Sequence, residues 1–368
     1  MGEHSAPLIA GGGPVGLAAG LFLHEQNIGT RIVERKLERL PYSKAFGVNP
    51  RTLELLESSG VTAQLLADGR KLTALNVWRK NRRVLRLDLS SLPHRYPFML
   101  VHSQAATEEL LEQALLDRGI PLERGITVSQ VEATGRGNVV QLTLADGTTE
   151  SFEPPEVLGA DGASSTVRES LGIGFPGSTW PEPWQLYDLE LEHFPLDDGE
   201  AHSFLNDSGV LFMLRMEGPW WRVAGNCPDL LSHLPAGSRP GRIAWESEFH
   251  ISHRLAARLR QGHVCLAGDA AHIHSPMGAR GMNLGIEDAY VYAQLLAENR
   301  LEDYGRIRHP QIRQVIRRIE RITSILRGRS LPAKAARILA PLAGAVAPLL
   351  ASQIRRFVLG QDHPVRLR

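Results

Sequence analysis

Glycines near the start of the chain have the spacing needed to bind the phosphates of a nucleotide. Residues 11–16 read GGGPVG and carry a G-x-G-x-x-G pattern, in which Gly11, Gly13, Pro14, Val15 and Gly16 are the predicted contacts. Gly11 permits a tight turn, Gly13 lets the backbone approach a pyrophosphate, and Gly16 allows a helix to pack closely on a strand. A helix that begins here presents free N–H groups and the positive end of its dipole to the phosphates. The pattern therefore predicts a dinucleotide site.

The residues that flank these glycines agree with the prediction. The apolar segment 7–10 is expected to be a strand, a helix is expected over 15–25, and a second strand over 30–33. Glu34 ends that strand, where a carboxylate accepts hydrogen bonds from a ribose, and Arg35 is predicted to lie in the same site. A glycine-rich turn that binds no ligand is the alternative, and the motif does not choose between FAD and NAD.

An Asp-Gly motif occupies the middle of the chain. Residues 157–168 read VLGADGASSTVR, in which an apolar strand end leads to Asp161 and then to a short helix with Ser164 or Ser165 as its N-cap. Arg168 lies in that helix. Taken alone, Asp161 is typical of a turn residue that caps a helix. Its place at the end of an apolar strand, together with the first motif, favours a ligand site.

A Gly-Asp motif follows later in the chain. Residues 264–272 read VCLAGDAAH, an apolar strand end that leads to Gly268 and Asp269. The segment 276–283, PMGARGMN, then opens a helix. Helix N-termini favour negative charge, so this segment is a second candidate for contact with an anionic ligand.

Together the three motifs resemble the flavoprotein aromatic hydroxylases, the family of para-hydroxybenzoate hydroxylase, and the resemblance extends to about Asp303. It implies that FAD occupies the first site and that Asp269, next to Gly268, hydrogen-bonds the ribityl chain. It implies that Asp161 and Arg168 serve both the FAD pyrophosphate and nicotinamide binding. It also implies that the flavin ring lies beside a set of residues in the third motif: Pro276, Gly278, Arg280, Gly281, Met282 and Asn283.

Two further segments match this family. Residues 43–56 resemble its flavin-contacting loop and helix, with Lys44 where Arg is usual, so a planar bidentate contact becomes a point charge. Gln104 precedes a helix expected over 105–116 and resembles the residue that touches the flavin. Arg280 stands where many members have Gln. These departures change local contacts and keep the overall pattern.

The resemblance implies a monooxygenase reaction. NADH or NADPH reduces the flavin, and molecular oxygen then supplies one atom to an electron-rich aromatic or heteroaromatic small molecule. The cofactor carries this chemistry, while the protein orients the substrate and excludes water. We assign no catalytic base. His272 and His274 are interpreted as loop histidines, solvated or hydrogen-bonded locally, because no acidic partner lies at ligand spacing, and we predict no metal.

These residues require a scaffold of alternating strands and helices. We predict an α/β fold, in which a Rossmann-like FAD-binding domain is interleaved with an antiparallel-sheet substrate domain and followed by a helical C-terminus. The expected FAD-binding domain comprises 1–74, 98–172 and 259–300, the substrate domain 75–97 and 173–258, and the helical region 301–368. Short stretches are typical of antiparallel strands: 72–78, 84–87, 185–191, 201–205, 210–216 and 220–224.

The composition limits the partners and the location. With 41 basic and 40 acidic residues, the net charge of +1 does not favour nucleic acid or an anionic membrane surface. The apolar run 338–351 is shorter than the ~20 residues of a spanning helix, so we expect a docked helical tail and no transmembrane segment.

Arginines between 306 and 329 are expected on a solvated helix face. Two cysteines without redox spacing and no evident export signal fit the cytoplasm, and the choice between monomer and homodimer stays open.

Two other classes of function remain open. Other FAD-dependent oxidoreductases, namely halogenases, epoxidases and double-bond reductases, share the first and third motifs. The W-x-W-x-I-P signature of flavin halogenases is absent from the sequence, and the Asp-Gly segment favours hydroxylation. The second alternative is a non-catalytic flavin-binding protein that supports a partner. Substrate-stimulated oxidation of NADH or NADPH distinguishes an enzyme from such a protein.

Overall fold

The computed structural model describes residues 6–40, 45–134, 137–276, 278–327, 347–363 and 365. The predicted flavin contact of Lys44 and most of the apolar run 338–351 lie outside the described residues. Within these ranges no helix is long and apolar enough to cross a membrane. In the same part of the chain, no group of three or more His, Cys, Asp and Glu side chains is arranged to hold a metal ion.

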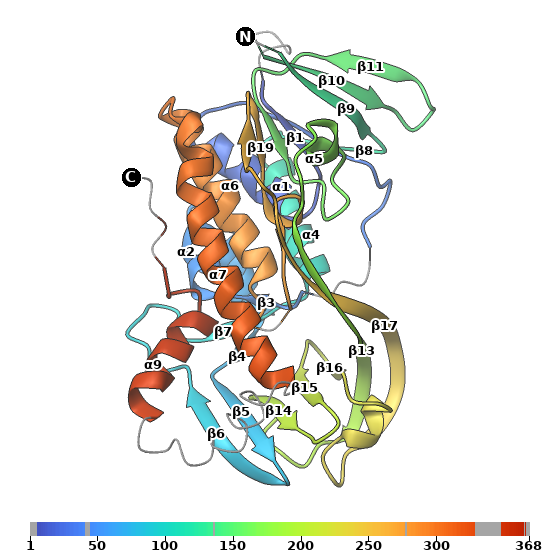
Figure 1. The fold of residues 1–368 in the computed structure, drawn as a ribbon, viewed down its shortest axis with the longest axis vertical. Helices are drawn as coiled ribbons and strands as arrows, with labels where there is room; N and C mark the ends of the chain where they lie inside the picture. Colours follow the sequence, from blue (N-terminus) through green and yellow to red (C-terminus); the bar gives the residue numbers. More distant parts are fainter. Residues whose placement is uncertain are drawn as a thin grey trace.

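A six-stranded sheet forms the upper part of the molecule in Figure 1. Its strand order is β18-β19-β12-β1-β2-β8, and neighbours run parallel except for β18 and β19. The central strands are buried at every position, as expected when a parallel sheet is covered on both faces. The strands are β1 (Leu8–Ala10), β2 (Arg31–Glu34), β8 (Leu122–Arg124), β12 (Val157–Gly159), β18 (Arg260–Gln261) and β19 (Val264–Leu266).

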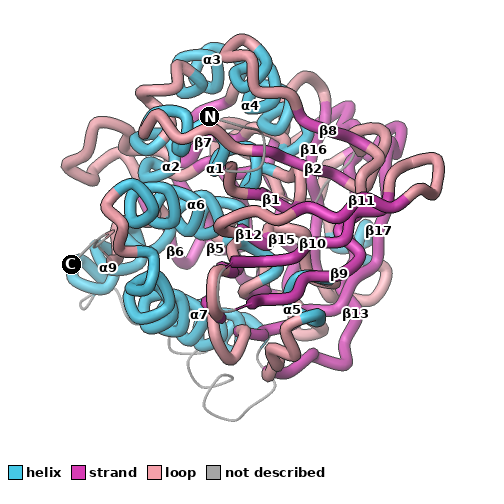
Figure 2. Tube along the Cα trace, turned by 90° about the horizontal axis from the view of Figure 1, so that it is seen from above, coloured by secondary structure: helices cyan, strands magenta, loops and turns pink. Residues whose placement is uncertain are grey.

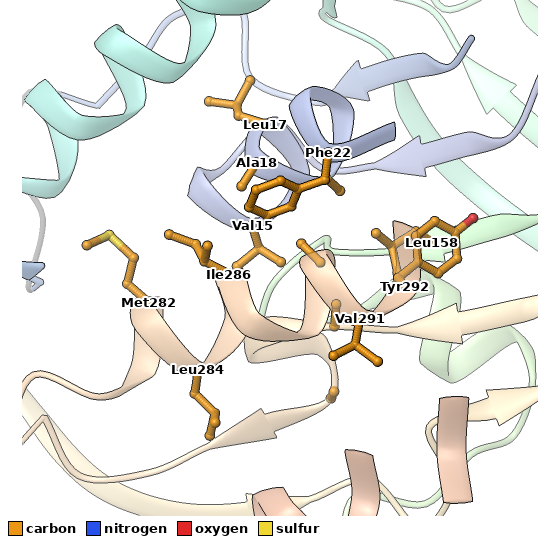
Figure 3. Close-up of a cluster of buried hydrophobic side chains, with 14 of the residues drawn as sticks. Val15, Leu17, Ala18, Phe22, Leu158, Met282, Leu284, Ile286, Val291 and Tyr292 are labelled. Atoms are coloured by element: carbon orange, nitrogen blue, oxygen red, sulfur yellow. The ribbon is translucent and has the colours of Figure 1, made fainter. Parts of the chain in front are cut away.

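Two helices pack against each other beside this sheet. Helix α1 (Pro14–Glu25) follows β1, and α6 (Gly281–Ala297) follows the third motif. Figure 3 shows Val15, Phe22 and Ile286 in one buried cluster to which both helices contribute. Glycine permits the close approach, because a Cβ atom built on Gly285 would lie only 2.5 Å from Cγ2 of Val15. The first turns of the two helices therefore lie close together.

An eight-stranded sheet, β20-β17-β13-β16-β15-β14-β5-β6, forms the lower part of the molecule (Figure 1). Its two longest strands, β13 (Gly177–His193) and β17 (Arg239–Leu255), pair antiparallel and run from the upper part into the lower part. The other strands are β5 (Ala74–Arg79), β6 (Arg82–Asp88), β14 (Ala201–Leu205), β15 (Val210–Arg215), β16 (Trp220–Gly225) and β20 (His272–Ile273).

The predicted antiparallel sheet is confirmed with one exception. Strands β14 and β5 pair parallel, so the sheet is mixed. The chain passes through the upper part of the molecule between these two strands, and no tight hairpin joins them to impose an antiparallel direction. The predicted division of the chain into domains stays a prediction.

Smaller elements complete the fold. Strands β9 (Thr127–Thr134), β10 (Gly137–Thr143) and β11 (Thr149–Phe152) form an antiparallel sheet, at the top of Figure 1, that the sequence analysis did not predict. A second small sheet contains β3 (Gly47–Val48), β4 (Arg70–Leu72) and β7 (Met99–Val101). The connecting helices are α2 (Pro50–Leu55), α3 (Val61–Asp68), α4 (Gln104–Leu116) and α5 (Thr166–Ser170). Short 3-10 turns span Leu230–His233, Gly268–Ala270 and Leu301–Asp303.

Helices α7 (Tyr304–Arg327) and α9 (Ala347–Val358) belong to the predicted helical C-terminus. Figure 2 shows α6 and α7 on one side of the molecule and the strands β9, β13 and β17 on the other. The expected solvated arginine face holds for Arg306, Arg313 and Arg317, which are exposed. It is wrong for Arg308, which is 0% exposed because Asp288 and Glu287 pair with it inside the protein.

Candidate functional site

A cavity of about 640 Å³ is lined by residues of both large sheets, and we call it the main cavity. Its volume lies within the range of roughly 300–1,000 Å³ that is usual for small-molecule and cofactor sites. Most residues predicted from the sequence line it: Gly13, Pro14, Val15, Glu34, Arg35, Gln104, Asp161, Asp269, Pro276, Arg280, Gly281 and Met282. Other predicted residues do not line it: Gly11, Gly16, Arg168, Gly268, Gly278 and Asn283.

The glycines of the first motif form the turn between β1 and α1. Gly11 has a φ of +115°, which side chains rarely adopt, and a Cβ atom there would lie 2.3 Å from the carbonyl oxygen of Ala160. A Cβ atom on Gly16 would lie 1.9 Å from the carbonyl oxygen of Gly11. Around Gly13, in contrast, no described atom lies within 4 Å of such a Cβ. The turn is therefore closely packed at Gly11 and Gly16 and open at Gly13.

The start of α1 and the end of β2 meet at this open turn. Gly13 is the N-cap of α1, and the helix has no side-chain cap among the described residues, so its first N–H groups are available to a ligand. Glu34 accepts hydrogen bonds from the backbone N–H groups of Gly12, at 2.8 Å, and Lys36, at 2.9 Å. These two bonds hold the carboxylate at the cavity wall. Its hydrogen bond to a ribose stays a prediction.

Asp161 both caps a helix and lines the main cavity. Its carboxylate accepts hydrogen bonds from the Ser165 hydroxyl, at 2.5 Å, and from the N–H of Val167, at 3.1 Å. Burial raises the pKa of Asp161, and these hydrogen bonds oppose the rise. Ser165, rather than Ser164, is the N-cap of α5, since its hydroxyl accepts from the N–H of Arg168 at 2.9 Å.

Arg168 connects the second and third motifs. It is buried and donates to the carbonyl oxygens of Ala163, at 3.0 Å, and Ala270, at 3.1 Å. Its guanidinium also lies 4.1 Å from the ring centroid of Phe175, a cation–π contact. This placement supports a structural role for the side chain. Its role in pyrophosphate and nicotinamide binding stays a prediction.

The Gly-Asp pair of the third motif lies over the start of α1. Gly268 has a φ of +57°, and a Cβ atom there would lie 2.9 Å from Cγ2 of Val15. Its N–H donates to a carboxylate oxygen of Asp288 at 3.1 Å. Asp269 follows, is exposed and lines the main cavity. The short loop therefore places the carboxylate of Asp269 in the main cavity. The buried carboxylate of Asp288, from α6, holds the backbone of the loop at Gly268.

A tight turn leads from the third motif into α6. Gly278 and Ala279 have φ values of +83° and +51°, and the N–H of Ala279 donates to the carbonyl oxygen of Pro276 at 3.0 Å. A positive φ is strained for an alanine and persists only where neighbouring groups hold it. Helix α6 begins directly afterwards, at Gly281, so the positive end of its dipole lies at the cavity wall.

Asn283 fixes this turn from behind the cavity. Its amide nitrogen donates to the carbonyl oxygens of Gly47, at 2.8 Å, and Ala279, at 2.5 Å. Its amide oxygen accepts from the N–H of Asn49, at 2.9 Å, and the hydroxyl of Thr52, at 2.7 Å. The side chain is 0% exposed, so it joins α6 to the segment around α2 rather than lying in the cavity.

The sequence analysis missed the cavity wall formed by β17. Phe249, His250, Ile251 and Ser252 line the main cavity, as does Phe46 from the loop before β3. Phe46 stacks on Phe212, with ring centroids 6.0 Å apart. In strand β17 the less exposed positions include the polar residues Ser247 and His253, so apolar and polar residues do not alternate regularly in its sequence.

The two histidines of the third motif are more buried than expected. The expectation of a solvated or locally hydrogen-bonded histidine is wrong for His272, which is 1% exposed and whose Nε2 lies 2.6 Å from a carboxylate oxygen of Asp288 on α6. His274 bonds locally, as expected, through Nδ1–H to the carbonyl oxygen of Ser275 at 2.9 Å. His274 also lines the main cavity, and burial lowers its pKa to about 3, so it is neutral at physiological pH.

The main cavity fits a dinucleotide such as FAD. Gly13 leaves open the space that a phosphate needs next to the uncapped start of α1. The lining continues from the Glu34 carboxylate past Asp161 and Asp269 to the start of α6 at Gly281. Fold and site together define a Rossmann-like dinucleotide-binding protein in which a second sheet closes the cofactor cavity.

Comparison with known families agrees with this class. The family model described as "FAD binding domain" matches residues 5–225 and 228–319. The chain belongs to this FAD-binding family, and FAD is its cofactor.

The relatives of the chain are named as monooxygenases. It is 34% identical to a 6-methylpretetramide 4-monooxygenase of Streptomyces rimosus over 79% of this chain and 55% of the relative. It is 32% identical to a pentachlorophenol 4-monooxygenase of Sphingobium chlorophenolicum over 78% and 57% of the two chains. The solved structure of OxyS anhydrotetracycline hydroxylase from Streptomyces rimosus superposes with a TM-score of 0.81 at 28% identity, covering 97% of this chain and 76% of that one. The chain thus spans little more than half the length of the 6-methylpretetramide and pentachlorophenol monooxygenases.

Proposed function

We propose that this protein is a flavin-dependent monooxygenase that uses FAD, NADH or NADPH, and molecular oxygen to hydroxylate an electron-rich aromatic or heteroaromatic small molecule. One observation carries the proposal: a single cavity connects the glycine turn at Gly13 with the wall of β17 from Phe249 to Ser252. Relatives named as monooxygenases of aromatic compounds support it. Bound FAD supplies the redox chemistry with the nicotinamide donor and oxygen.

The protein contributes electrostatics and orientation. The N-terminus of α6 at Gly281 would stabilise negative charge at the cavity wall. Phe46, Phe249 and Ile251 offer apolar surface against which a flat aromatic molecule packs and from which water is excluded. His274 is a neutral side chain in the same lining. None of these residues is assigned as a catalytic base.

The test is a screen of phenols, anilines, quinolones and polyketide phenols for stimulated oxidation of NADH or NADPH. A true substrate is expected to accelerate the oxidation and to gain one oxygen atom per turnover. With ¹⁸O-labelled molecular oxygen, the label should appear in the product. A label that enters only from water would contradict hydroxylation by oxygen. A poorly fitting analogue is expected to accelerate oxidation and release hydrogen peroxide instead.

Other outcomes of the same screen would replace the proposal. Halide in the product, epoxidation of an isolated alkene, or reduction of a double bond would assign the chain to another class of flavin oxidoreductase. Absence of stimulated turnover with every compound would favour a flavin-binding protein that supports a partner. The cytoplasmic location stays a prediction, and the choice between monomer and homodimer stays open.

A further inference from the structure

The last described residues of the chain lie against the helices that build the main cavity. Gly360, Gln361, Asp362 and His363 follow α9, and we call them the C-terminal clamp. Arg51 of α2 donates to the carbonyl oxygen of His363 at 2.9 Å and to the Gln361 side chain at 3.3 Å. Gly360 lies so close to Asn49 that a Cβ atom there would be 2.4 Å from its amide nitrogen. The clamp is therefore closely fitted to the segment that Asn283 also holds.

Asp362 binds two arginines, Arg280 directly before α6 and Arg318 in α7. One carboxylate oxygen accepts from Nη1 of Arg280 at 3.0 Å, and the other accepts from Nη1 of Arg318 at 2.8 Å. The side chains of Arg280 and Asp362 are 0% and 4% exposed. Arg280 also donates to the carbonyl oxygen of Phe357 and lies over its ring, 5.3 Å from the centroid. The clamp thus holds the residue that directly precedes α6.

His363 extends the clamp into the core. Its Nε2 lies 2.8 Å from a carboxylate oxygen of Glu287, and its Nδ1 lies 3.1 Å from Asp362. Glu287 is fully buried on α6 and also pairs with Arg308 of α7 at 3.5 Å. A chain of buried charges therefore joins the clamp to α6 and α7. Such charges favour one arrangement, because breaking a pair leaves an uncompensated ion inside the protein.

Arg280 belongs to the strained turn that lines the main cavity. The turn contains Ala279 at a positive φ, and Arg280 and Gly281 both contribute to the cavity lining. Strain of this kind persists only where the surroundings fix it. Asn283 fixes the turn at the carbonyl oxygen of Ala279, and the clamp fixes it at the guanidinium of Arg280.

We propose that the C-terminal clamp positions the wall of the FAD cavity, with Asp362 as a positioning residue that acts through Arg280. The clamp contacts the turn from outside the cavity, so it shapes the surface that meets the flavin while it stays out of contact with the cofactor itself. The proposal concerns FAD binding and holds whether or not the protein hydroxylates an aromatic compound.

The charge of Asp362 has a second effect. Among the described residues, Nε and Nη2 of Arg280 have no hydrogen-bond partner. Asp362 is the carboxylate that pairs directly with Arg280 beside the main cavity. Without it, the buried guanidinium would add positive potential near the flavin and favour the reduced, more negative cofactor.

The test compares four variants of the full chain: Asp362→Asn, Asp362→Glu, Arg280→Gln with Asp362→Asn, and Arg355→Ala as the matched control. Arg355 joins α9 to β6 by donating to the carbonyl oxygen of Asp88 at 2.6 Å, so its loss removes a contact of α9 while both ion pairs of Asp362 stay in place. The dissociation constant of FAD is measured by fluorescence titration of the apoprotein. The midpoint potential and visible spectrum are measured on the FAD complex.

Asp362→Asn is expected to weaken FAD binding about tenfold or more, since a buried ion pair is broken, and to shift the midpoint potential upward. Asp362→Glu should recover most of the affinity, and Arg355→Ala should leave affinity and potential close to wild type. The double variant should lose FAD affinity without the upward shift of the midpoint potential, because both charges of the pair are removed. If Asp362→Asn does not fold, the double variant takes its place in the test. Wild-type affinity and potential in Asp362→Asn would overturn the proposal, as would an equal loss in Arg355→Ala.

Discussion

The two ends of the main cavity are built in different ways. At one end, the turn of Gly11, Gly13 and Gly16 is made by residues adjacent in the sequence, and its shape depends on missing side chains. At the other end, the turn before α6 is held by Asn283 and by Asp362, which lies more than eighty residues later. The first end is determined locally by backbone sterics, and the second by long-range hydrogen bonds and charge. Substitutions at the two ends should therefore have different effects on the stability of the apoprotein and on FAD binding.

The sharpest contrast lies within the glycine turn itself. Gly16→Ala should destabilise the apoprotein by about 3 kcal/mol, because its Cβ would overlap backbone that cannot move cheaply. Gly13→Ala should leave the apoprotein as stable as wild type and abolish tight FAD binding, since its Cβ meets only the space of the ligand. Urea unfolding of the apoproteins and FAD titration check both. Equal stability of the two variants would show that the turn is not packed as described.

At the other end, Asn283→Ala should act on folding and binding together. It removes four hydrogen bonds and leaves buried groups of Gly47, Asn49 and Thr52 without partners. We expect a loss of about 2–3 kcal/mol in unfolding free energy and weaker FAD binding. Gln113→Ala, which removes an exposed hydrogen bond to Asp117, is the control and should have little effect. A stable variant with normal FAD affinity would show that this end does not depend on Asn283.

Replacement of Asp269 should affect FAD binding but not the stability of the protein. Asp269 is exposed in the main cavity, so Asp269→Ala should leave the apoprotein stable. A charged acceptor for the ribityl hydroxyls would be lost, at about 1.5–3 kcal/mol of FAD binding. Calorimetric titration of the apoprotein with FAD measures this. Unchanged affinity would remove Asp269 from the predicted contact.

The smallest effect concerns pH and the C-terminal clamp. Burial alone would lower the pKa of His363, but hydrogen bonds to Asp362 and Glu287 raise it above the ordinary value of 6.5. Its stabilisation is therefore complete below that value and is lost as the pH rises through the raised pKa. Arg308 pairs with the same Glu287, and Arg280 and Arg318 pair with the same Asp362. Relative to wild type, His363→Gln should flatten the decline of unfolding free energy above neutral pH, and an unchanged slope would contradict this role.

The sequence predicted those features that depend on neighbouring residues. The three strand-to-turn motifs and the start of α6 at Gly281 were confirmed because apolar runs and glycine spacing are local signals. Strand β17 was missed because its exposure alternates over residues 245–253, yet polar Ser247 and His253 occupy less exposed positions, so apolar and polar residues do not alternate in the sequence. Asp288 was missed as the partner of His272, and Asp362 as that of Arg280, because only the folded helices bring these charges together. Arg308 was placed on the surface for the same reason.

The strand order of the upper sheet has a consequence for folding of the chain during its synthesis. Strand β1 lies between β2 and β12, and β12 pairs in turn with β19, whose residues are made only after Arg260. Helix α1 likewise finds its main packing partner in α6. Contacts between such distant segments close long loops and form slowly. During synthesis the apolar surfaces of β12 and α1 therefore stay without these partners until β19 and α6 have left the ribosome, and apolar surface exposed in this way favours aggregation.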